Sequence, residues 1–216
     1  CFNYFKDRLA RFYGTVVNLA IANDWMHKNP FAGIRFQEKE VIREVLTKEE
    51  IERMMCKEFA LPRLEYVRDV FIFCVFTGMA YVDVNNLRQE HIVRDNNDDL
   101  WIRKARQKTN NMCNIPLLKI PQLLMEKYKN HPLCTKTGAL LPVPSNQKMN
   151  SYLKEIADFC GIQKNLTTHT ARHTFATVVA LANGVSMENI AKMLGHSDIR
   201  MTQRYAKVMD SSIMRD

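Results

Sequence analysis

Apolar residues recur at steps of three and four through the first part of the chain. The apolar positions of this segment are Phe5, Leu9, Phe12, Val16, Leu19 and Ile21. This spacing places them on one face of a helix, so it predicts an amphipathic helix over 2–22. The helical pattern is expected to end before Pro30, because proline disfavours helix at the residue before it.

A polar stretch at 37–40 offers nothing to bury, and a clear helix start follows at Thr47. Thr47 and Glu50 have the spacing of a capping box, in which each side chain bonds the backbone N–H of the other residue. Leu46 and Ile51 lie where a hydrophobic staple needs apolar residues. We therefore expect a linker over 37–46 and a main domain over 47–216.

The main domain has a mostly helical pattern with one interruption. The segment 64–76 is apolar on nearly every side, which is typical of a helix buried in the core, and Gly78 is expected to end it. Further helices are expected over 83–87, 123–129, 147–160, 170–182 and 187–194 and after Ser197, with a loop over 133–145. Three short runs separated by Asn-rich turns, at 92–93, 100–104 and 112–115, predict strands. The expected fold class is mainly α with a small three-stranded antiparallel sheet (α+β).

The charge balance favours an anionic partner. The chain of 216 residues carries 31 Lys and Arg against 23 Asp and Glu, a formal net charge of +8. Such an excess indicates nucleic acid or a membrane surface as partner, although an ordinary basic surface gives the same count. No apolar run approaches the ~20 residues that span a bilayer, which argues against a membrane-spanning protein.

The cysteines and the first residues add two expectations. The six cysteines are scattered without a Cys-x-x-Cys pair, which favours free thiols in a reducing cytoplasm over a zinc site or a disulfide framework. The sequence begins at Cys1 without an initiator Met or a signal-peptide pattern, so a fragment of a protein that is not secreted is expected.

Two polar clusters in the last quarter of the chain could carry chemistry. His169 and Arg172 stand three apart at the entry to a predicted helix, where free backbone N–H groups favour an anion. His196 follows directly on Gly195, which is expected to end a helix, and Tyr205 comes nine residues after His196. Taken singly, these features also fit a solvated helix face, a turn histidine and a buried tyrosine.

In combination, His-x-x-Arg at 169–172, Leu-Gly-His at 194–196 and Tyr205 resemble the catalytic domain of tyrosine recombinases, the phage-integrase family. The resemblance covers 46–208 and implies the fold of these DNA breaking-rejoining enzymes. It also implies that 1–36 is the C-terminal helix of a truncated core-binding (SAM-like) domain. In the family, a tyrosine oxygen attacks a DNA phosphodiester and forms a 3′-phosphotyrosine without ATP or metal, so no cofactor is expected.

The resemblance assigns roles to five residues. Tyr205 would be the nucleophile, and Arg172 would hold the non-bridging phosphate oxygens with its two-pronged guanidinium. His169 and His196 would hydrogen-bond the phosphate and help to move the proton of the nucleophile. Lys108, on the expected turn between the second and third strands, matches the lysine that protonates the leaving 5′-oxygen in the family.

One position departs from the family pattern. The first arginine of the family lies in a Thr-Gly-Leu-Arg stretch, but here Ala80 stands in its place, with Asp83 in the acidic position three residues later. Loss of such a cation is expected to cost about 3–4 kcal/mol of transition-state stabilisation. Arg106 is the first candidate substitute, because on an extended strand it would face the same side as Lys108. Arg88, which is close in sequence to Ala80, is the second candidate. The alternative that Arg106 only contacts the DNA backbone or solvent stays open.

The resemblance therefore predicts a site-specific recombinase, the integrase of a mobile element. Its expected partners are double-stranded DNA, further copies of the chain as a homotetramer on two duplexes, and accessory DNA-bending or directionality factors, with no membrane. Without DNA the chain is expected to be weakly associated or monomeric, in the bacterial cytoplasm at the nucleoid. Two alternatives stay open: a catalytically weakened DNA-binding module of the same fold, and a type IB topoisomerase.

Overall fold

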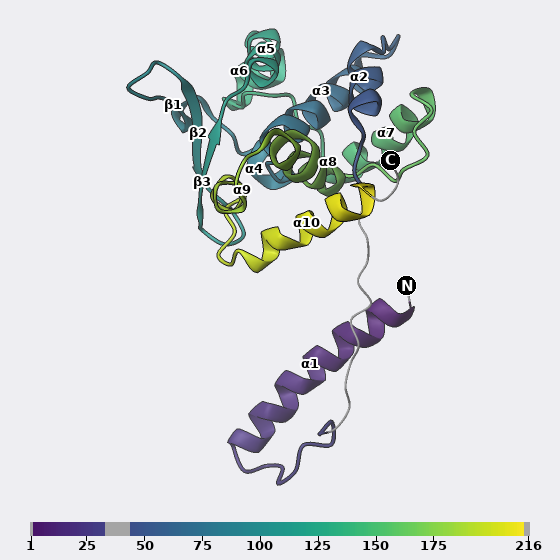
Figure 1. Ribbon diagram of the computed structural model, residues 1–216, viewed down its shortest axis with the longest axis vertical. Helices are drawn as coiled ribbons and strands as arrows, with labels where there is room; N and C mark the ends of the chain where they lie inside the picture. Colours follow the sequence, from purple (N-terminus) through teal and green to yellow (C-terminus); the bar gives the residue numbers. More distant parts are fainter. Residues whose placement is uncertain (1, 33–43, 214–216) are drawn as a thin grey trace. The chain divides into compact units, whose positions relative to one another are not determined.

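The computed structural model describes residues 2–32 and 44–213, and it divides the chain into two compact units, Cys1–Ile42 and Arg43–Asp216. The first unit contains α1 (Phe2–Ala22), which confirms the helix predicted from the periodicity (Figure 1). Most of the linker predicted for 37–46 lies outside the described residues. The elements described below belong to the second unit.

The second unit opens with α2 (Lys48–Cys56), and its first turn has the predicted cap. The hydroxyl of Thr47 accepts a hydrogen bond from the Glu50 amide at 3.2 Å, and the Glu50 carboxylate accepts one from the Thr47 amide at 2.8 Å. Leu46 and Ile51 are both buried beside the cap. Local sequence therefore decides where this helix begins.

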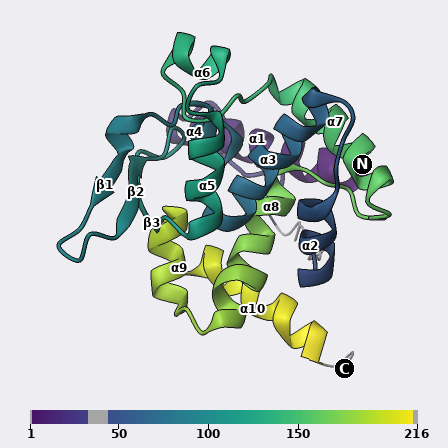
Figure 2. The same cartoon turned by 90° about the horizontal axis from the view of Figure 1, so that it is seen from above.

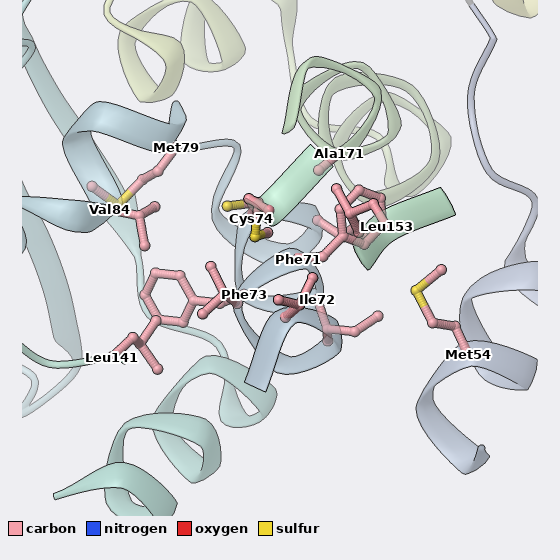
Figure 3. Packing of buried hydrophobic residues seen from close by; sticks show 14 of the residues in the cluster. Met54, Phe71, Ile72, Phe73, Cys74, Met79, Val84, Leu141, Leu153 and Ala171 are labelled. Carbon is pink, nitrogen blue, oxygen red and sulfur yellow. The ribbon is translucent and has the colours of Figure 1, made fainter. Parts of the chain in front are cut away.

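Helix α3 (Pro62–Thr77) is the centre of the core. Nearly every face of it is buried, as its uniformly apolar pattern predicts, and Gly78 ends it with a left-handed φ of +66°. Figure 3 shows Phe71 of this helix among side chains from other segments, including Met54 of α2 and Leu153. The helices packed around α3 are α2, α5 (Lys119–Tyr128), α7 (Asn146–Phe159) and α8 (Thr168–Thr174).

The predicted sheet is present at one edge of this helical body (Figure 1). A short helix α4 (Tyr81–Asn85) and a 3₁₀ turn (Gln89–His91) lead into it. Its antiparallel strands, in the order β1-β2-β3, are β1 (Ile92–Arg94), β2 (Leu100–Ala105) and β3 (Met112–Pro116). The inner face of β3 lies against α9 (Met187–Leu194), as Figure 2 also shows.

The loop predicted for 133–145 is wrong in part, because it contains the short helix α6 (Pro132–Thr137). Pro132 occupies the first turn, where its missing N–H is not needed, and the ring of His131 accepts a hydrogen bond from the Leu133 amide at 3.3 Å. Gly138 ends the helix with a φ of +70°. Pro132, one residue before the predicted loop, thus starts a helix that extends into it.

The segment predicted as one helix over 170–182 begins at Thr168 and changes type along its length. After α8 it continues as a π-helical stretch (Phe175–Ala180) and a 3₁₀ turn (Leu181–Asn183). The hydroxyls of Thr174 and Thr177 each donate to the carbonyl four residues back, at 2.8 and 2.9 Å. Such bonds compete with the backbone ladder, which accounts for the irregular turn.

The last helix, α10 (Arg200–Ile213), begins two residues later than a start directly after Ser197 would place it. The carboxylate of Asp198 accepts a hydrogen bond from the Arg200 amide at 2.9 Å, and the Asp198 carbonyl accepts one from Met201 at 3.1 Å. Asp198, rather than Ser197, therefore supplies the acceptor at the start of this helix.

Candidate active site

Arg172 lies at the point where three distant segments of the chain meet. It is the fifth residue of α8 and only 6% of its surface is exposed. Its Nη1 donates to the carbonyl oxygen of Gly78 at 2.7 Å, and its Nη2 donates to that of Leu194 at 2.5 Å. Both carbonyls belong to the ends of helices, where carbonyl groups lack partners within the helix. The turns after α3 and α9 therefore hold this guanidinium in place.

Glycine is required at the first of these turns. Gly78 has a φ of +66°, and a β-carbon on it would lie 2.4 Å from Cδ1 of Phe175. The Thr-Gly stretch that resembles the family motif thus sets the backbone so that its carbonyl meets Arg172. The adjacent Ala80 is the residue before α4, with extended backbone, and its side chain is partly buried.

His196 contacts Arg172 directly. Its Nε2 lies 3.2 Å from Nη2 of Arg172, and its Nδ1 lies 2.9 Å from the hydroxyl of Thr202. Burial and the charge of Arg172 lower the pKa of His196 to about 4, so the ring is neutral at neutral pH. Because a guanidinium can only donate, Nε2 is the acceptor and the proton resides on Nδ1, facing Thr202.

Tyr205 is the sixth residue of α10, one and a half turns into the helix, and only 7% of its surface is exposed. Its ring is nearly parallel to that of His196, with 6.4 Å between the centroids. The ring of His173 lies 5.4 Å from that of Tyr205. Tyr205, Arg172 and His196 therefore form one cluster, as the combined sequence motif predicts.

Arg106 also belongs to this cluster, although not by the geometry expected from the sequence. Strand β2 ends at Ala105 and Lys108 lies in the following turn, so the expectation that both cations share a face of an extended strand is wrong. The Nη1 of Arg106 instead donates to the carbonyl of Gly195 at 3.4 Å, and its Nε lies 3.9 Å from Oδ2 of Asp83. This Nε is buried and has no hydrogen-bond acceptor among the described residues.

The remaining predicted residues lie outside this cluster or at its border. Lys108 is exposed in the turn between β2 and β3, and His169 is exposed at the second position of α8. The guanidinium of Arg88 donates to the carbonyls of Asn85 and Leu87, which ties it to the end of α4 rather than to Arg172. The structure therefore favours Arg106 over Arg88 as the cation nearest to Arg172.

Four side chains near the cluster are absent from the sequence-based set: His91, Lys104, His173 and Thr202. Lys104 lines a small cleft together with Asp83, Arg106 and Arg172. The alternation of β2, in which Ile102 is buried and Arg103 is exposed, could have indicated that Lys104 points inward. No comparable signal in the sequence indicates Thr202, whose contact with His196 depends on how the turn after α9 leads into α10.

The cluster carries more positive charge than its own carboxylate neutralises. Arg172, Arg106 and Lys104 line the cleft with Asp83 as its single acidic side chain. Burial and the charge of Arg106 lower the pKa of Arg172 from its usual value. Such an arrangement is suited to an anion with several oxygens, such as a phosphodiester. Among the described residues, no three His, Cys, Asp or Glu side chains are placed to hold a metal ion.

A family model described as the phage integrase family matches residues 44–212. The chain belongs to the phage integrase family. Tyrosine recombinase XerD of Staphylococcus saprophyticus is 40% identical over 95 residues, which are 44% of this chain and 31% of that protein. XerD of Staphylococcus aureus strain N315 is 42% identical over 71 residues, 33% of this chain and 24% of that protein. The matched stretches thus span less than a third of these relatives.

Three solved structures share the fold. XerA recombinase has a TM-score of 0.59 and 22% identity, covering 82% of this chain and 66% of that one. A lambda integrase fragment, solved as a dimer bound to a core site, has a TM-score of 0.67 and 18% identity over 89% of this chain and 69% of that one. The Tn1549 transposon integrase with circular intermediate DNA has a TM-score of 0.69 and 15% identity over 96% and 77%. The predicted fold of a tyrosine recombinase catalytic domain is confirmed.

No helix among residues 2–32 and 44–213 is both long and apolar enough to cross a membrane.

Proposed function

We propose that the protein is a site-specific DNA recombinase, which cuts and rejoins DNA strands through a 3′-phosphotyrosine intermediate. The observation that carries the proposal is the convergence of Arg172, His196 and Tyr205 from three segments, beside a cleft with excess positive charge that Arg172 lines. Membership of the phage integrase family supports the same reaction. The DNA-bound Tn1549 and lambda integrases support integration and excision of a mobile element as its role.

In the proposed reaction, the phenolic oxygen of Tyr205 forms a bond to phosphorus while the bond from phosphorus to the 5′-oxygen breaks. Arg172 holds the non-bridging oxygens. The two backbone carbonyls to which its guanidinium donates fix the position of the side chain but do not neutralise its charge. Lys108 protonates the leaving 5′-oxygen, and the turn that carries it has to close over the DNA. The freed 5′-hydroxyl of a second strand attacks the phosphotyrosine in the reverse sense, which restores the tyrosine.

The proton of Tyr205 goes to a neutral histidine, with His196 and His169 as the candidates. In the structure the Nε2 lone pair of His196 accepts from Arg172. A phosphate that draws the guanidinium toward itself releases this lone pair for the phenol. The same negative charge opposes the effect of Arg172 on His196 and raises the pKa of the imidazole from its low value of about 4, which makes it a better base.

Arg106 is proposed as the substitute for the arginine that Ala80 replaces. Asp83, three residues after Ala80, lies 3.9 Å from Nε of Arg106, so the guanidinium reaches the start of α4. Its charge also lowers the pKa of Arg172, which requires the two cations to be close. A second guanidinium at this place restores the charge that a metal-free phosphoryl-transfer site needs.

The assembly and location of the protein follow from the same proposal. We propose double-stranded DNA as the partner, a homotetramer on two duplexes as the working form, a weakly associated or monomeric state without DNA, and accessory factors that bend DNA or set direction. Residues 1–36 would be the C-terminal helix of a truncated core-binding (SAM-like) domain, since exposed apolar side chains such as Leu19 suit packing within such a domain. The bacterial XerD relatives support a place in the bacterial cytoplasm at the nucleoid.

Covalent capture tests the proposal. The protein is incubated with labelled DNA that carries the ends of its element, and adducts are resolved on a denaturing gel. The wild-type protein is expected to form an adduct, whereas Tyr205→Phe binds the same DNA without one. Binding by the wild type without any adduct would instead establish the catalytically weakened binding module. Relaxation of a supercoiled plasmid without strand exchange would favour the type IB topoisomerase.

A further inference from the structure

Lys104 enters the cleft from the inner face of β2. The strand alternates, with Ile102 fully buried, Arg103 exposed and Lys104 partly buried. In the sheet, Lys104 is paired with Cys113, whose side chain lines the same cleft. The lysine therefore projects toward Arg172 rather than into solvent.

The imidazole of His91, which contacts Lys104, offers this ammonium neither a negative charge nor a lone pair. The Nζ of Lys104 lies 3.2 Å from Nε2 of His91, and Nδ1 of His91 accepts a hydrogen bond from the Arg88 amide at 2.9 Å. A neutral imidazole that accepts at Nδ1 carries its proton on Nε2, so a donor faces the ammonium donors of Lys104. Burial and the charge of Lys104 lower the pKa of His91, in accord with a neutral ring.

The second feature of Lys104 is that no carboxylate of the described residues forms an ion pair with it. Among the described residues it forms no ion pair within 4.0 Å, whereas the exposed Glu90 lies 3.9 Å from the ring of His91. In the tautomer set by the Arg88 amide, the imidazole beside this ammonium offers it no lone pair. Its donors are therefore available to an oxygen of an anion bound in the cleft that Lys104 lines with Arg172.

We propose that Lys104 binds a non-bridging oxygen of the scissile phosphate as the third cation of the site. The inference rests on the proposed recombinase function and extends it to a residue outside the sequence motif. Lys104, Arg106 and Arg172 face one carboxylate, Asp83, which leaves a net charge of about +2 when all are ionised. A phosphodiester carries about one negative charge and its pentacoordinate transition state about two, so the third cation favours the transition state over the bound substrate.

This role differs from that of Lys108. Lys108 would give a proton to the leaving oxygen, whereas Lys104 keeps its protons and neutralises charge on oxygens that stay bonded to phosphorus. A substrate with sulfur in place of the leaving 5′-oxygen separates the two roles, because a thiolate leaves without protonation. That substrate is expected to rescue loss of a proton donor and not loss of a charge.

The test measures the single-turnover rate of phosphotyrosine formation on a nicked suicide duplex. Lys104→Met is expected to slow the reaction about 100-fold and Lys104→Arg about tenfold or less, by analogy with removal of one oxyanion donor. The 5′-phosphorothiolate duplex is expected to restore Lys108→Met but not Lys104→Met. Arg103→Met, on the exposed face of the same strand, is the matched control and should react as the wild type does.

Two measurements keep this test interpretable. The dissociation constant for the same duplex is measured for Tyr205→Phe and for the double variant Tyr205→Phe, Lys104→Met. The two values are expected to differ by less than about threefold, since the lysine acts mainly in the transition state. Thermal unfolding shows that Lys104→Met is folded. Each of three results would overturn the proposal. Lys104→Met could cleave at the full rate, the phosphorothiolate could rescue it, or its loss of rate could be matched by an equal loss of affinity. Absence of cleavage by the wild type would instead contradict the proposed function.

Discussion

Arg106 packs across Gly195 so closely that no side chain fits between them. A β-carbon on Gly195 would lie 2.6 Å from Cδ of Arg106 and 2.7 Å from Sγ of Cys113. The carbonyl of Gly195 accepts hydrogen bonds from Arg106 and from the side chain of Asn111, at 3.4 and 3.2 Å. The turn that presents His196 and the loop that presents Arg106 are therefore positioned against each other, and the glycine is what allows their approach.

Gly195→Ala is expected to lose both stability and cleavage activity. The φ of +60° disfavours any side chain, and the new methyl group has to displace Arg106. We expect about 2–4 kcal/mol less stability in urea unfolding and a cleavage rate reduced at least tenfold. Gly184→Ala is the control, because its φ is +78° with no atom within 4 Å of the added carbon. It should lose about 1 kcal/mol and keep its activity; equal effects of the two substitutions would contradict the argument.

Thr202→Val is expected to weaken catalysis through His196. Thr202 is fully buried, and its hydroxyl is 2.9 Å from Nδ1 of the imidazole. Valine has a similar shape but leaves the Nδ1 proton without an acceptor, at a cost of about 1–3 kcal/mol. The cleavage rate should fall roughly tenfold while DNA affinity holds, and Thr202→Ser should restore most of the rate. A Val variant with the wild-type rate and pH profile would show that this contact does not orient the histidine.

The stability of the protein is expected to fall below pH 6.5 because of His196. The pKa of this ring is lowered to about 4 in the folded protein, whereas an unfolded histidine titrates near about 6.5. Between these pH values the histidine binds a proton in the unfolded chain but not in the folded protein. The free energy of unfolding therefore decreases as the pH falls toward about 4. Allowing for partial exposure, the loss should be about 1–2 kcal/mol.

Urea unfolding at several pH values between 7.5 and 4.5 measures this effect. His91 acts in the same direction, so the comparison is between the wild type and His196→Gln, which retains His91. The stability of the Gln variant should depend less on pH over this range. Parallel curves for the two proteins would mean that His196 does not titrate as its surroundings require.

Local signals in the sequence predicted most of the fold. The capping box at Thr47, the uniformly apolar helix before Gly78 and the three short strands each depend on residues within a few positions of one another. The errors arise where one residue type has two uses. Pro132 starts a helix instead of marking a loop, and the threonines of the segment after α8 change its helix type.

The candidate site could be predicted only as far as its motif extends. Arg172, His196 and Tyr205 were found because their spacing is specific, and the structure brings them together. Arg106 is predicted from an extended strand that in fact ends at Ala105. The hydrogen bond that places it at the site is to Gly195, 89 residues away. The alternation of β2 could have indicated that Lys104 points inward, but not that it meets Arg172 there. Contacts between turns that are distant in sequence leave no periodic signal, so sequence patterns miss them.

Restoring the arginine that Ala80 replaces should help only a protein that lacks Arg106. Arg106→Ala is expected to slow phosphotyrosine formation about 100-fold, the effect of removing one donor from an oxyanion site. Ala80→Arg in that background should recover at least tenfold, because a side chain from the start of α4 reaches toward Asp83, which Arg106 otherwise faces at 3.9 Å. In the wild-type background the two guanidiniums would compete for one place, so Ala80→Arg should bring no gain.

The four proteins form a double-mutant cycle in which the coupling between positions 80 and 106 is the measured quantity. Single-turnover rates on the same suicide duplex give it directly, and thermal unfolding confirms that each variant is folded. A full rate for Arg106→Ala would show that this cation is only a contact with the DNA backbone or solvent. An equal rate gain from Ala80→Arg in both backgrounds would show that the place is vacant in the wild type. Only a gain confined to the Arg106→Ala background means that Arg106 supplies the positive charge that an arginine at position 80 would supply.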